Sequence, residues 1–186
     1  MLASASPRRL DLLAQINVTP SRIIAANIDE TPRPCEVPRA LAKRLAFDKA
    51  AAIAAQEPDG LILAADTVVS VGRRILPKTE NAEEARACLQ LMSGRGHRVH
   101  SGICLMQGGR HWRRVVTSRV QMRRLGGEDI EAYLATGEWQ GKAGGYAIQG
   151  QAAAFISQIT GSYSNIVGLP LFETANLLQA AGFRSS

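Results

Sequence analysis

An N-terminal turn brings together side chains that bind anions. Ser4 and Ser6 supply two hydroxyls, and Arg8 and Arg9 supply two guanidinium groups. Ser6 followed by Pro7 is typical of an N-cap and a first helical residue, so the turn precedes a helix. Free backbone N–H groups at a helix N-terminus attract anions, and arginine pairs well with phosphate oxygens. The turn therefore predicts a phosphate-binding site, with an ordinary capped helix and solvated arginines as the alternative.

One carboxylate interrupts an apolar run. Asp66 lies within residues 61–71, which otherwise have the composition of a buried strand. A carboxylate in such a run costs free energy unless it is paired, binds a metal or faces a cleft at a strand end. Asp66 is therefore a candidate functional residue, and the alternative is a strand-end aspartate that forms a local turn.

Further charged residues could complete such a site. Asp29 and Glu30 lie in a proline-rich loop and, with Asp66, offer oxygen ligands suited to Mg²⁺. A solvated acidic loop is the alternative. Lys49 falls on a predicted helix and Lys78 after a predicted hairpin, where each either binds substrate or is a surface lysine. Lysine is scarce, because only four of the 22 basic residues are lysines: Lys43, Lys49, Lys78 and Lys142.

Two other segments carry weaker signals. The glycine-rich segment 137–145 contains Lys142, but Ala143 stands where a phosphate loop needs the serine or threonine that binds Mg²⁺. The spacing from Gly137 to Gly141 is also one residue short, so a P-loop nucleotidase is excluded. Residues 161–165, Gly-Ser-Tyr-Ser-Asn, either bind a base, sugar or phosphate or form an ordinary turn.

The elements that must position these residues alternate between helices and strands. We expect helices from Pro7, over 39–56, from Asn81 to Ser93, over 128–135 and from Pro170 to before Gly182. We expect strands over 2–4, 61–71, 75–76, 99–106, 112–124, 146–148 and 153–159, with turns at 72–73 and 107–109. This order predicts an α/β fold with a central mixed β-sheet flanked by helices.

Length and composition set the remaining limits. The 186 residues suit a single domain over 1–186, and 46% hydrophobic residues indicate a globular chain. No apolar run reaches the ~18 residues of a membrane span, and no signal-peptide pattern opens the chain, so we expect a cytoplasmic protein without membrane contact. Three distant cysteines exclude a disulfide framework and a cysteine-built zinc site. The net charge of +6 is compatible with nucleic-acid binding, but the sequence has no motif of interleaved aromatic and basic residues. We therefore expect no nucleic-acid partner.

Eight blocks of sequence occur in order along nearly the whole chain. They are LASASPRR at 2–9, DE at 29–30, FDKA at 47–50, AADTVV at 64–69, PKTENAEEA at 77–85, LMSGRGHRV at 91–99, GKAGGYAIQG at 141–150 and ITGSYSNIVGLPLFET at 159–174. Together they resemble the Maf family of nucleoside triphosphate pyrophosphatases. The resemblance implies a Maf/ITPase-like fold of two lobes with a cleft between them, and it suits a homodimer. It also implies hydrolysis of a nucleoside triphosphate to the monophosphate and pyrophosphate with a divalent cation, Mg²⁺ or Mn²⁺.

The same resemblance assigns roles to individual residues. It implies that Asp66 is the catalytic carboxylate that acts on the attacking water, and that Glu30 and Asp66 hold the metal. One departure is Thr79, which follows Lys78 where the family usually has proline. The residues that the resemblance implies for phosphate and substrate binding are Ser4, Ser6, Arg9, Lys49 and Lys78.

Three positions resemble the specificity markers of the family: Arg8, Thr67 and Gln149. At these three positions the chain is similar to the branch of the family that acts on dTTP and UTP. The 7-methyl-GTP branch has a glutamine after the aspartate and an acid near position 149. An amide both donates and accepts, which matches the N3–H and carbonyl edge of uracil or thymine. The resemblance thus implies a dTTP/UTP pyrophosphatase that removes unwanted pyrimidine nucleotides. The alternatives are a 7-methyl-GTP pyrophosphatase and a regulatory protein linked to cell division.

Overall fold

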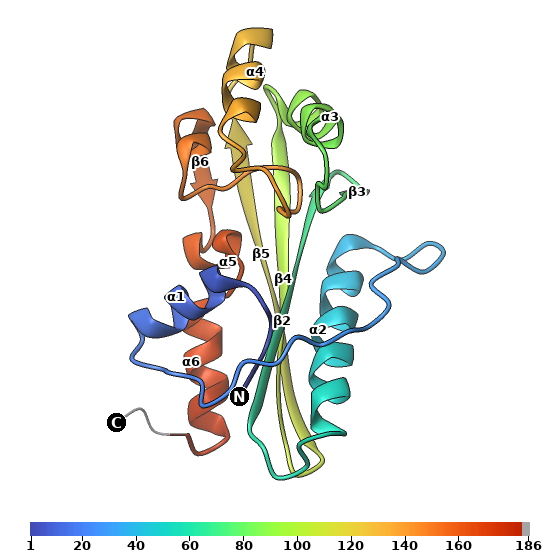
Figure 1. Cartoon of the computed structure of the whole chain (residues 1–186), viewed down its shortest axis with the longest axis vertical. Coiled ribbons are helices and arrows are strands. Elements are labelled where there is room, and N and C mark those ends of the chain that lie inside the picture. Colours follow the sequence, from blue (N-terminus) through green and yellow to red (C-terminus); the bar gives the residue numbers. More distant parts are fainter. Residues whose placement is uncertain (184–186) are drawn as a thin grey trace.

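One six-stranded mixed sheet organises the fold (Figure 1). In the computed structural model, which describes residues 1–183, the strand order is β1–β2–β4–β5–β6, and β3 pairs with β2. β1 runs parallel to β2, and the other pairs are antiparallel. The predicted mixed sheet is confirmed, whereas the two lobes and the single domain stay predictions. The strands are β1 (Leu2–Ala3), β2 (Ile62–Val71), β3 (Arg74–Leu76), β4 (Gly96–Gln107), β5 (Arg110–Met122) and β6 (Ile156–Thr160).

The long hairpin of β4 and β5 forms the centre of the sheet. Gln107 pairs with Arg110, so only Gly108 and Gly109 make the turn, with φ angles of 54° and 76°. A two-residue hairpin of this kind needs positive φ at both positions, which glycine adopts without strain. On its other side β4 pairs with β2 along most of its length, which places Asp66 in the middle of the sheet.

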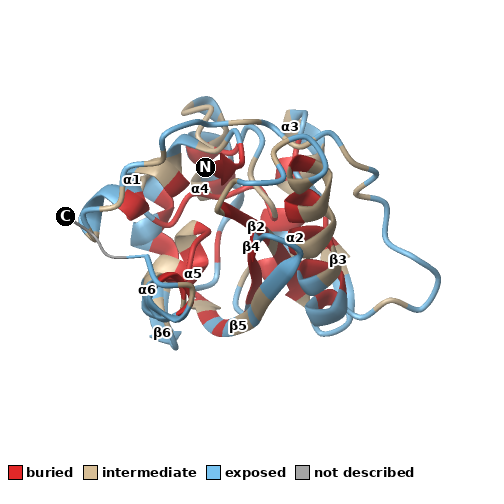
Figure 2. Cartoon of the chain, turned by 90° about the horizontal axis from the view of Figure 1, so that it is seen from below, coloured by how far each residue is buried: buried red, intermediate tan, exposed pale blue. Residues whose placement is uncertain are grey.

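Helices cover both faces of one half of the sheet (Figure 1). Side chains alternate between the faces of a strand. On β4, Ile103 and Leu105 accordingly pack with residues of α1 and α6, whereas Cys104 and Met106 pack with residues of α2. Figure 2 shows that these helices bury the sides that face the strands and expose the opposite sides. The helices are α1 (Pro7–Gln15), α2 (Pro38–Ala54), α3 (Ala82–Met92), α4 (Gly127–Ala135), α5 (Tyr163–Val167) and α6 (Leu171–Ala180).

A further apolar cluster fills the other half of the sheet. It joins α3 and α4 to β2, β4 and β5, and Met92, Met122 and Tyr133 are buried in it. α3 begins where the sequence predicts, because the Asn81 side chain accepts a hydrogen bond from the Glu84 N–H. The α3–α4 layer carries the segments that close one side of the site described below.

One strand prediction in the last third of the chain is wrong, and another places the start of its strand too early. Residues 146–148 form no strand, and a 3₁₀-helix, η1 (Gln151–Phe155), replaces the first part of the strand expected over 153–159. Short apolar runs do not distinguish strands from other buried segments. Here Gly144 and Gly145, with φ of 74° and 68°, turn the chain just before the apolar residues. Residues 161–165, for which the sequence left open a binding segment or an ordinary turn, contain the start of α5, which Ser162 caps.

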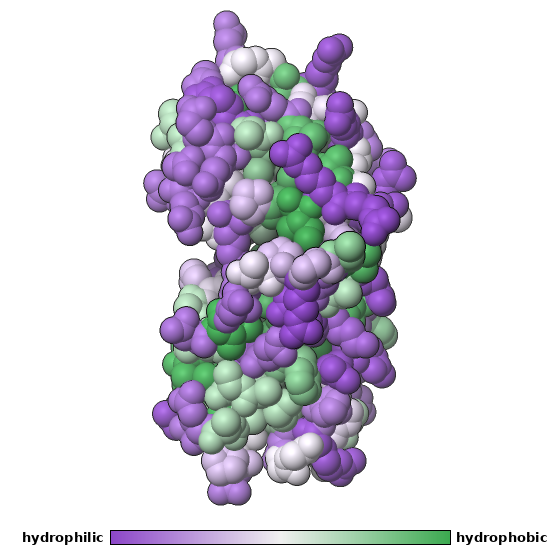
Figure 3. All heavy atoms as spheres, turned by 90° about the vertical axis from the view of Figure 1, so that its right-hand side faces the viewer, coloured by the Kyte–Doolittle hydropathy of each residue, from purple (hydrophilic) through white to green (hydrophobic). Residues whose placement is uncertain are grey.

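Figure 3 shows hydrophilic side chains over much of one face, with smaller hydrophobic patches between them. Within residues 1–183 we find no helix with both the length and the hydropathy to cross a bilayer. Cys35 is an exposed free thiol, and Cys88 and Cys104 are buried free thiols.

Candidate active site

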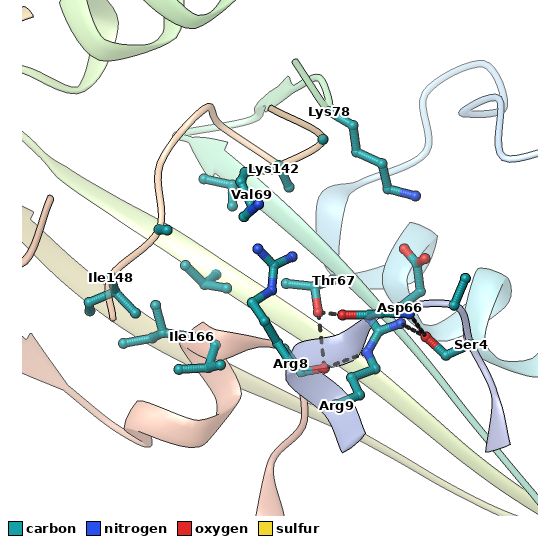
Figure 4. Close-up of a pocket in the computed structure, with 18 of the residues that line it drawn as sticks. Ser4, Arg8, Arg9, Asp66, Thr67, Val69, Lys78, Lys142, Ile148 and Ile166 are labelled. Carbon is teal, nitrogen blue, oxygen red and sulfur yellow. Dashed lines mark hydrogen bonds between the residues drawn. The ribbon is translucent and has the colours of Figure 1, made fainter. Parts of the chain in front are cut away.

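A pocket lies beside the middle of β2 (Figure 4). Its volume is ≈ 280 Å³, and its walls come from the turn before α1, the loop at 25–30, segment 141–149 and α5. Asp29 does not reach it, because this side chain is exposed and accepts a hydrogen bond from the Thr31 N–H at 2.9 Å. The pocket is lined by all ten residues that the sequence selected for catalysis, binding or specificity: Ser4, Ser6, Arg8, Arg9, Glu30, Lys49, Asp66, Thr67, Lys78 and Gln149.

Asp66 and Lys49 form a buried ion pair at one end of this pocket. Lys49 Nζ, on α2, lies 2.5 Å from Asp66 Oδ1, and the two residues are only 7% and 2% exposed. α2 approaches the sheet this closely because Gly102, the β4 partner of Asp66, has no side chain. A Cβ at Gly102 would lie 2.1 Å from the Ala42 carbonyl oxygen. Each buried charge is tolerated because the other compensates it.

Glu30 extends the pair into a row of four alternating charges. Its carboxylate lies 2.6 Å from Lys49 Nζ and also pairs with Lys78 Nζ. Burial by itself raises the pKa of Glu30, but hydrogen bonds from Lys49 and Lys78 outweigh burial and leave this pKa below its ordinary value. Glu30 is therefore ionised at neutral pH, and the ammonium group of Lys49 lies between two carboxylates.

Lys78 is held by a loop that pairs with the glycine-rich segment. The Thr79 N–H donates to the Lys142 carbonyl at 3.1 Å, and the Thr79 carbonyl accepts from Gly141 at 2.9 Å. The buried Thr79 hydroxyl donates to the Trp139 carbonyl at 2.7 Å. Proline at this position would lack both donors. Threonine in place of proline thus ties Lys78 to the segment that carries Lys142.

Arg9 is bound mainly by the protein itself. Its guanidinium group donates to Gly168 O at 2.9 Å, Ser4 Oγ at 2.8 Å and Thr67 Oγ1 at 3.3 Å, the contacts drawn as dashes in Figure 4. A guanidinium group has five N–H donors, so these three contacts leave two for any ligand. Because Arg9 is 9% exposed, its first effect is to join the N-terminal turn, β2 and the turn after α5.

Arg8 directs its guanidinium group into the pocket. The side chain extends into the pocket beside Thr67 and toward Lys142 (Figure 4). Its buried Nε has no hydrogen-bond partner among residues 1–183. Burial lowers the pKa of Arg8, but arginine keeps its charge in proteins. A cation with unused donors therefore faces the cavity.

The other end of the pocket is apolar, and the sequence did not reveal it. Val69, Val99, Ile148 and Ile166 line this end, and each is buried. They come from β2, β4, the irregular segment 144–149 and α5. Their residue types do not differ from those of ordinary core positions, so no sequence signal marks them as pocket residues.

Lys142 is a second residue that the sequence did not select. It lines the pocket near Val69 and Arg8 (Figure 4). Burial lowers the pKa of Lys142, and the positive charge of Arg8 adds to this effect. Two weak signals pointed to it, namely the scarcity of lysine in the chain and the glycine-rich segment 137–145 that contains it.

Comparison with known proteins places the chain in a family. The family profile described as Maf-like protein matches residues 1–181. The chain belongs to the Maf family. Among curated relatives, the dTTP/UTP pyrophosphatase of Paramagnetospirillum magneticum is 58% identical over 98% of this Maf chain and 97% of the relative. The dTTP/UTP pyrophosphatases of Mesorhizobium japonicum and Chelativorans sp. are 56% and 55% identical over 99% and 100% of this chain, and over 92% of each relative. The resemblance inferred from the eight sequence blocks is confirmed.

Proposed function

We propose that this Maf-family chain hydrolyses dTTP and UTP to the monophosphate and pyrophosphate, cleaving between the α and β phosphates. One observation carries the proposal: a single pocket has a buried, lysine-paired carboxylate at one end and an apolar wall at the other. A nucleoside triphosphate has the matching halves, a polyanionic tail and a flat base. The names of the similar curated proteins support the same reaction and the same two substrates.

The charges lining the pocket suit a polyanion. Two carboxylates, Glu30 and Asp66, face a larger number of cations in the same cavity, and this surplus of positive charge favours a triphosphate. Phosphoryl transfer depends mostly on positioning and on neutralising the charge that spreads over the phosphoryl oxygens. The cations lining the cavity are Arg8, Arg9, Lys49, Lys78 and Lys142.

We assign to Asp66 the activation of the attacking water. Its carboxylate would orient that water and accept its proton as the bond to the α-phosphorus forms. Lys49 holds Oδ1 of Asp66 at 2.5 Å and so fixes the direction of the carboxylate. Arg8 and Lys78 would donate to oxygens of the phosphate chain and stabilise the charge on the leaving pyrophosphate.

The charged end also fits a divalent metal ion, Mg²⁺ or Mn²⁺. The Lys49 ammonium group lies between Glu30 and Asp66, so a cation is already accommodated at this position. Within residues 1–183 no group of three or more His, Cys, Asp and Glu side chains surrounds a possible metal position. Glu30 and Asp66 would therefore hold the ion together with substrate phosphates and water, which is usual for Mg²⁺. When bound, the ion would supply further charge neutralisation.

The apolar end would receive the base. Val69, Val99, Ile148 and Ile166 offer a buried surface to the ring, and the exposed Gln149 at the rim offers an amide. That amide can both donate to and accept from the edge of uracil or thymine. The substrates would then be dTTP, UTP and modified pyrimidine nucleotides of the cytoplasmic pool.

Pyrophosphate release from a panel of nucleotides tests the proposal. The panel is dTTP, UTP, CTP, GTP and 7-methyl-GTP, each with Mg²⁺ and with Mn²⁺. We expect release mainly from dTTP and UTP. Preference for 7-methyl-GTP would keep the reaction and overturn the base assignment, and a folded sample without release from any nucleotide would overturn the reaction itself.

A further inference from the structure

A row of hydroxyl groups crosses the sheet beside the pocket. Thr67 on β2 pairs in register with Ser101 on β4, and their hydroxyl oxygens are 2.9 Å apart. Ser118 lies on β5 opposite Val99, and both serines are completely buried. The row separates two apolar clusters of the core, one containing Val69 and Val99 and the other containing Ile103. Polar side chains at such a position need partners, because an unpaired buried hydroxyl costs free energy.

Asn165 on α5 provides partners for this row. Its amide nitrogen Nδ2 donates to Ser118 Oγ at 2.9 Å and to the Val99 carbonyl at 3.1 Å. Its backbone carbonyl accepts from Ser101 Oγ at 3.0 Å. Asn165 is completely buried and does not line the pocket. It therefore acts on α5 and on the sheet, and not directly on a ligand.

The hydrogen bonds form a chain with one direction. A hydroxyl has a single proton. Because Ser101 donates its proton to Asn165 O, the bond between Thr67 and Ser101 uses the proton of Thr67. Thr67 in turn accepts from Arg9 Nη2 at 3.3 Å. The chain thus runs from Arg9 through Thr67 and Ser101 to Asn165, and it occupies the Thr67 hydroxyl that a base would otherwise contact.

α5 brings residues to both ends of the pocket. Ile166 and Val167 line the apolar end, and the Gly168 carbonyl accepts from Arg9 Nε at 2.9 Å. α5 has only five residues, and helices this short are unstable without tertiary contacts. Its position therefore depends on the bonds of Asn165 and on those of its cap, where Ser118 and Ser162 exchange two hydrogen bonds of 3.0 Å.

We propose that Asn165 is a positioning residue that sets base discrimination by fixing α5 against the hydroxyl row, and that it acts through Ser101, Thr67 and Gly168. The proposal rests on the proposed function, because it takes the apolar end as the base site. On this proposal Thr67, which the family resemblance marks for specificity, acts on the choice of base through its hydrogen bonds to Arg9 and Ser101.

The role proposed for Asn165 depends on the N–H donors of its side-chain amide. Aspartate has the same shape but no N–H, so it cannot donate to the Val99 carbonyl, and its negative charge would be buried beside that oxygen. Asn165→Asp is therefore the sharpest variant, since it removes the donors and keeps the volume. Ser101→Ala is a milder second variant, which removes only the hydroxyl between Thr67 and Asn165.

Calorimetric binding of dTTP and CTP, in EDTA so that no turnover occurs, tests the proposal. We expect Asn165→Asp and Asn165→Ala to weaken dTTP binding about tenfold, with a smaller effect on CTP, so that the ratio of the two dissociation constants falls. The control is Thr174→Val, which removes one buried local hydrogen bond, to the Pro170 carbonyl at 2.8 Å, away from the pocket. This control should lower thermal stability and leave the ratio unchanged.

The outcomes separate this proposal from the proposed function. Variants that lose stability like the control but keep the wild-type ratio overturn the positioning role, and so does a wild-type chain that binds dTTP and CTP equally. Pyrophosphate release by the wild type with Mg²⁺ tests the reaction independently. If the Asn165 variants do not fold, the Ser101→Ala variant tests the proposal in their place. We expect it to reduce the ratio of the two dissociation constants, and an unchanged ratio would overturn the proposal. Ser101→Ala combined with Asn165→Ala should show a non-additive effect on the ratio, because both residues belong to one chain of bonds.

Discussion

The two ends of the pocket are built from different kinds of structure. The charged end takes Lys49 from a long helix, Asp66 from a central strand, and the serines and arginines from a strand–helix turn. The apolar end takes Ile148 from a segment without regular structure and Ile166 from a five-residue helix. Asp66 and Lys49 are thus carried by the backbone hydrogen bonds of regular elements, whereas Ile148 and Ile166 depend more on side-chain contacts. The division is not complete, because Glu30 and Lys78 at the charged end lie in loops, and Val69 and Val99 at the apolar end lie on β2 and β4.

Two tyrosines show how side chains hold the apolar end. The Tyr133 hydroxyl accepts from the Ala147 N–H at 3.0 Å, and the Tyr146 hydroxyl lies 2.7 Å from His97 Nε2. Both tyrosines are buried, and Tyr146 itself lines the pocket. Since a few side-chain contacts replace a ladder of backbone bonds, single substitutions should affect this end more selectively. The comparison predicts that substitutions at the charged end lower turnover, whereas substitutions at the apolar end weaken substrate binding.

Asp66→Asn should give the largest effect and acts on the charged end alone. The amide keeps the size of the carboxylate but cannot accept the proton of the attacking water. We expect pyrophosphate release from dTTP to fall by about 10³-fold or more, with kcat carrying most of the loss. Circular dichroism and equilibrium binding of dTTP in EDTA serve as controls for the fold and the apolar end. Near-normal turnover by a folded Asp66→Asn protein would remove Asp66 from its role.

The adjacent arginines allow a sharper version of the same comparison. Arg9→Lys should lower the free energy of unfolding by about 2 kcal/mol, since one ammonium group cannot replace a guanidinium fork that joins three separate acceptors. Arg8→Lys should change stability by less than about 0.5 kcal/mol, because Arg8 Nε has no partner in the described part of the chain, and should raise KM for dTTP instead. Chemical denaturation and steady-state kinetics measure both. Equal stability losses in the two variants would contradict the division of roles.

Regular elements of the fold could be predicted from the sequence, whereas the irregular ones could not. Asn81 marks the start of α3 because its cap is a local contact, and the Gly-Gly pair marks the β4–β5 turn. The wrong strand at 146–148 has a physical cause. The Ala147 N–H donates to the Tyr133 side chain, and the Ala147 carbonyl accepts from Gly150, so no neighbouring strand is needed.

The same limit applies to the site. Residue types and the family resemblance selected ten residues that line one cavity, but their pairings are tertiary. Arg9 binds a carbonyl 159 positions away, and Lys49 bridges a loop and a strand. The apolar end stayed hidden because its residues share the composition of the core. The charged residues of the pocket can therefore be identified from the sequence, whereas the shape of the base site cannot.

Acid should destabilise the fold through His97, whose side chain lies beneath the apolar end. His97 is 1% exposed, and burial lowers its pKa to about 4. The unfolded chain takes up this proton below its ordinary pKa of about 6.5, so stability is complete above about pH 6.5 and falls as the pH drops toward 4. Between about pH 7 and pH 5 we expect a loss of about 2 kcal/mol from this group.

His97→Gln isolates this contribution, because glutamine does not titrate and can still bond the Tyr146 hydroxyl. Thermal or urea unfolding across the pH range should give a flatter profile for the variant. Burial, followed by Arg98 and Arg39, also lowers the pKa of His100, so part of the wild-type slope should remain. Identical slopes in the wild type and the variant would show that His97 is not the group responsible.

Tyr146→Phe should have a small effect and the most local one. The substitution removes one hydroxyl and leaves Nε2 of the buried His97 without a partner, as its Nδ1 already is among residues 1–183. We expect a loss of about 1–2 kcal/mol in stability and a rise of KM for dTTP of about threefold, with kcat unchanged. Tyr163→Phe is the matched control, because Tyr163 is 49% exposed and should tolerate the change. A fall in kcat without a change in KM would mean that the apolar end takes part in the chemistry, and the division of the pocket into two ends would not hold.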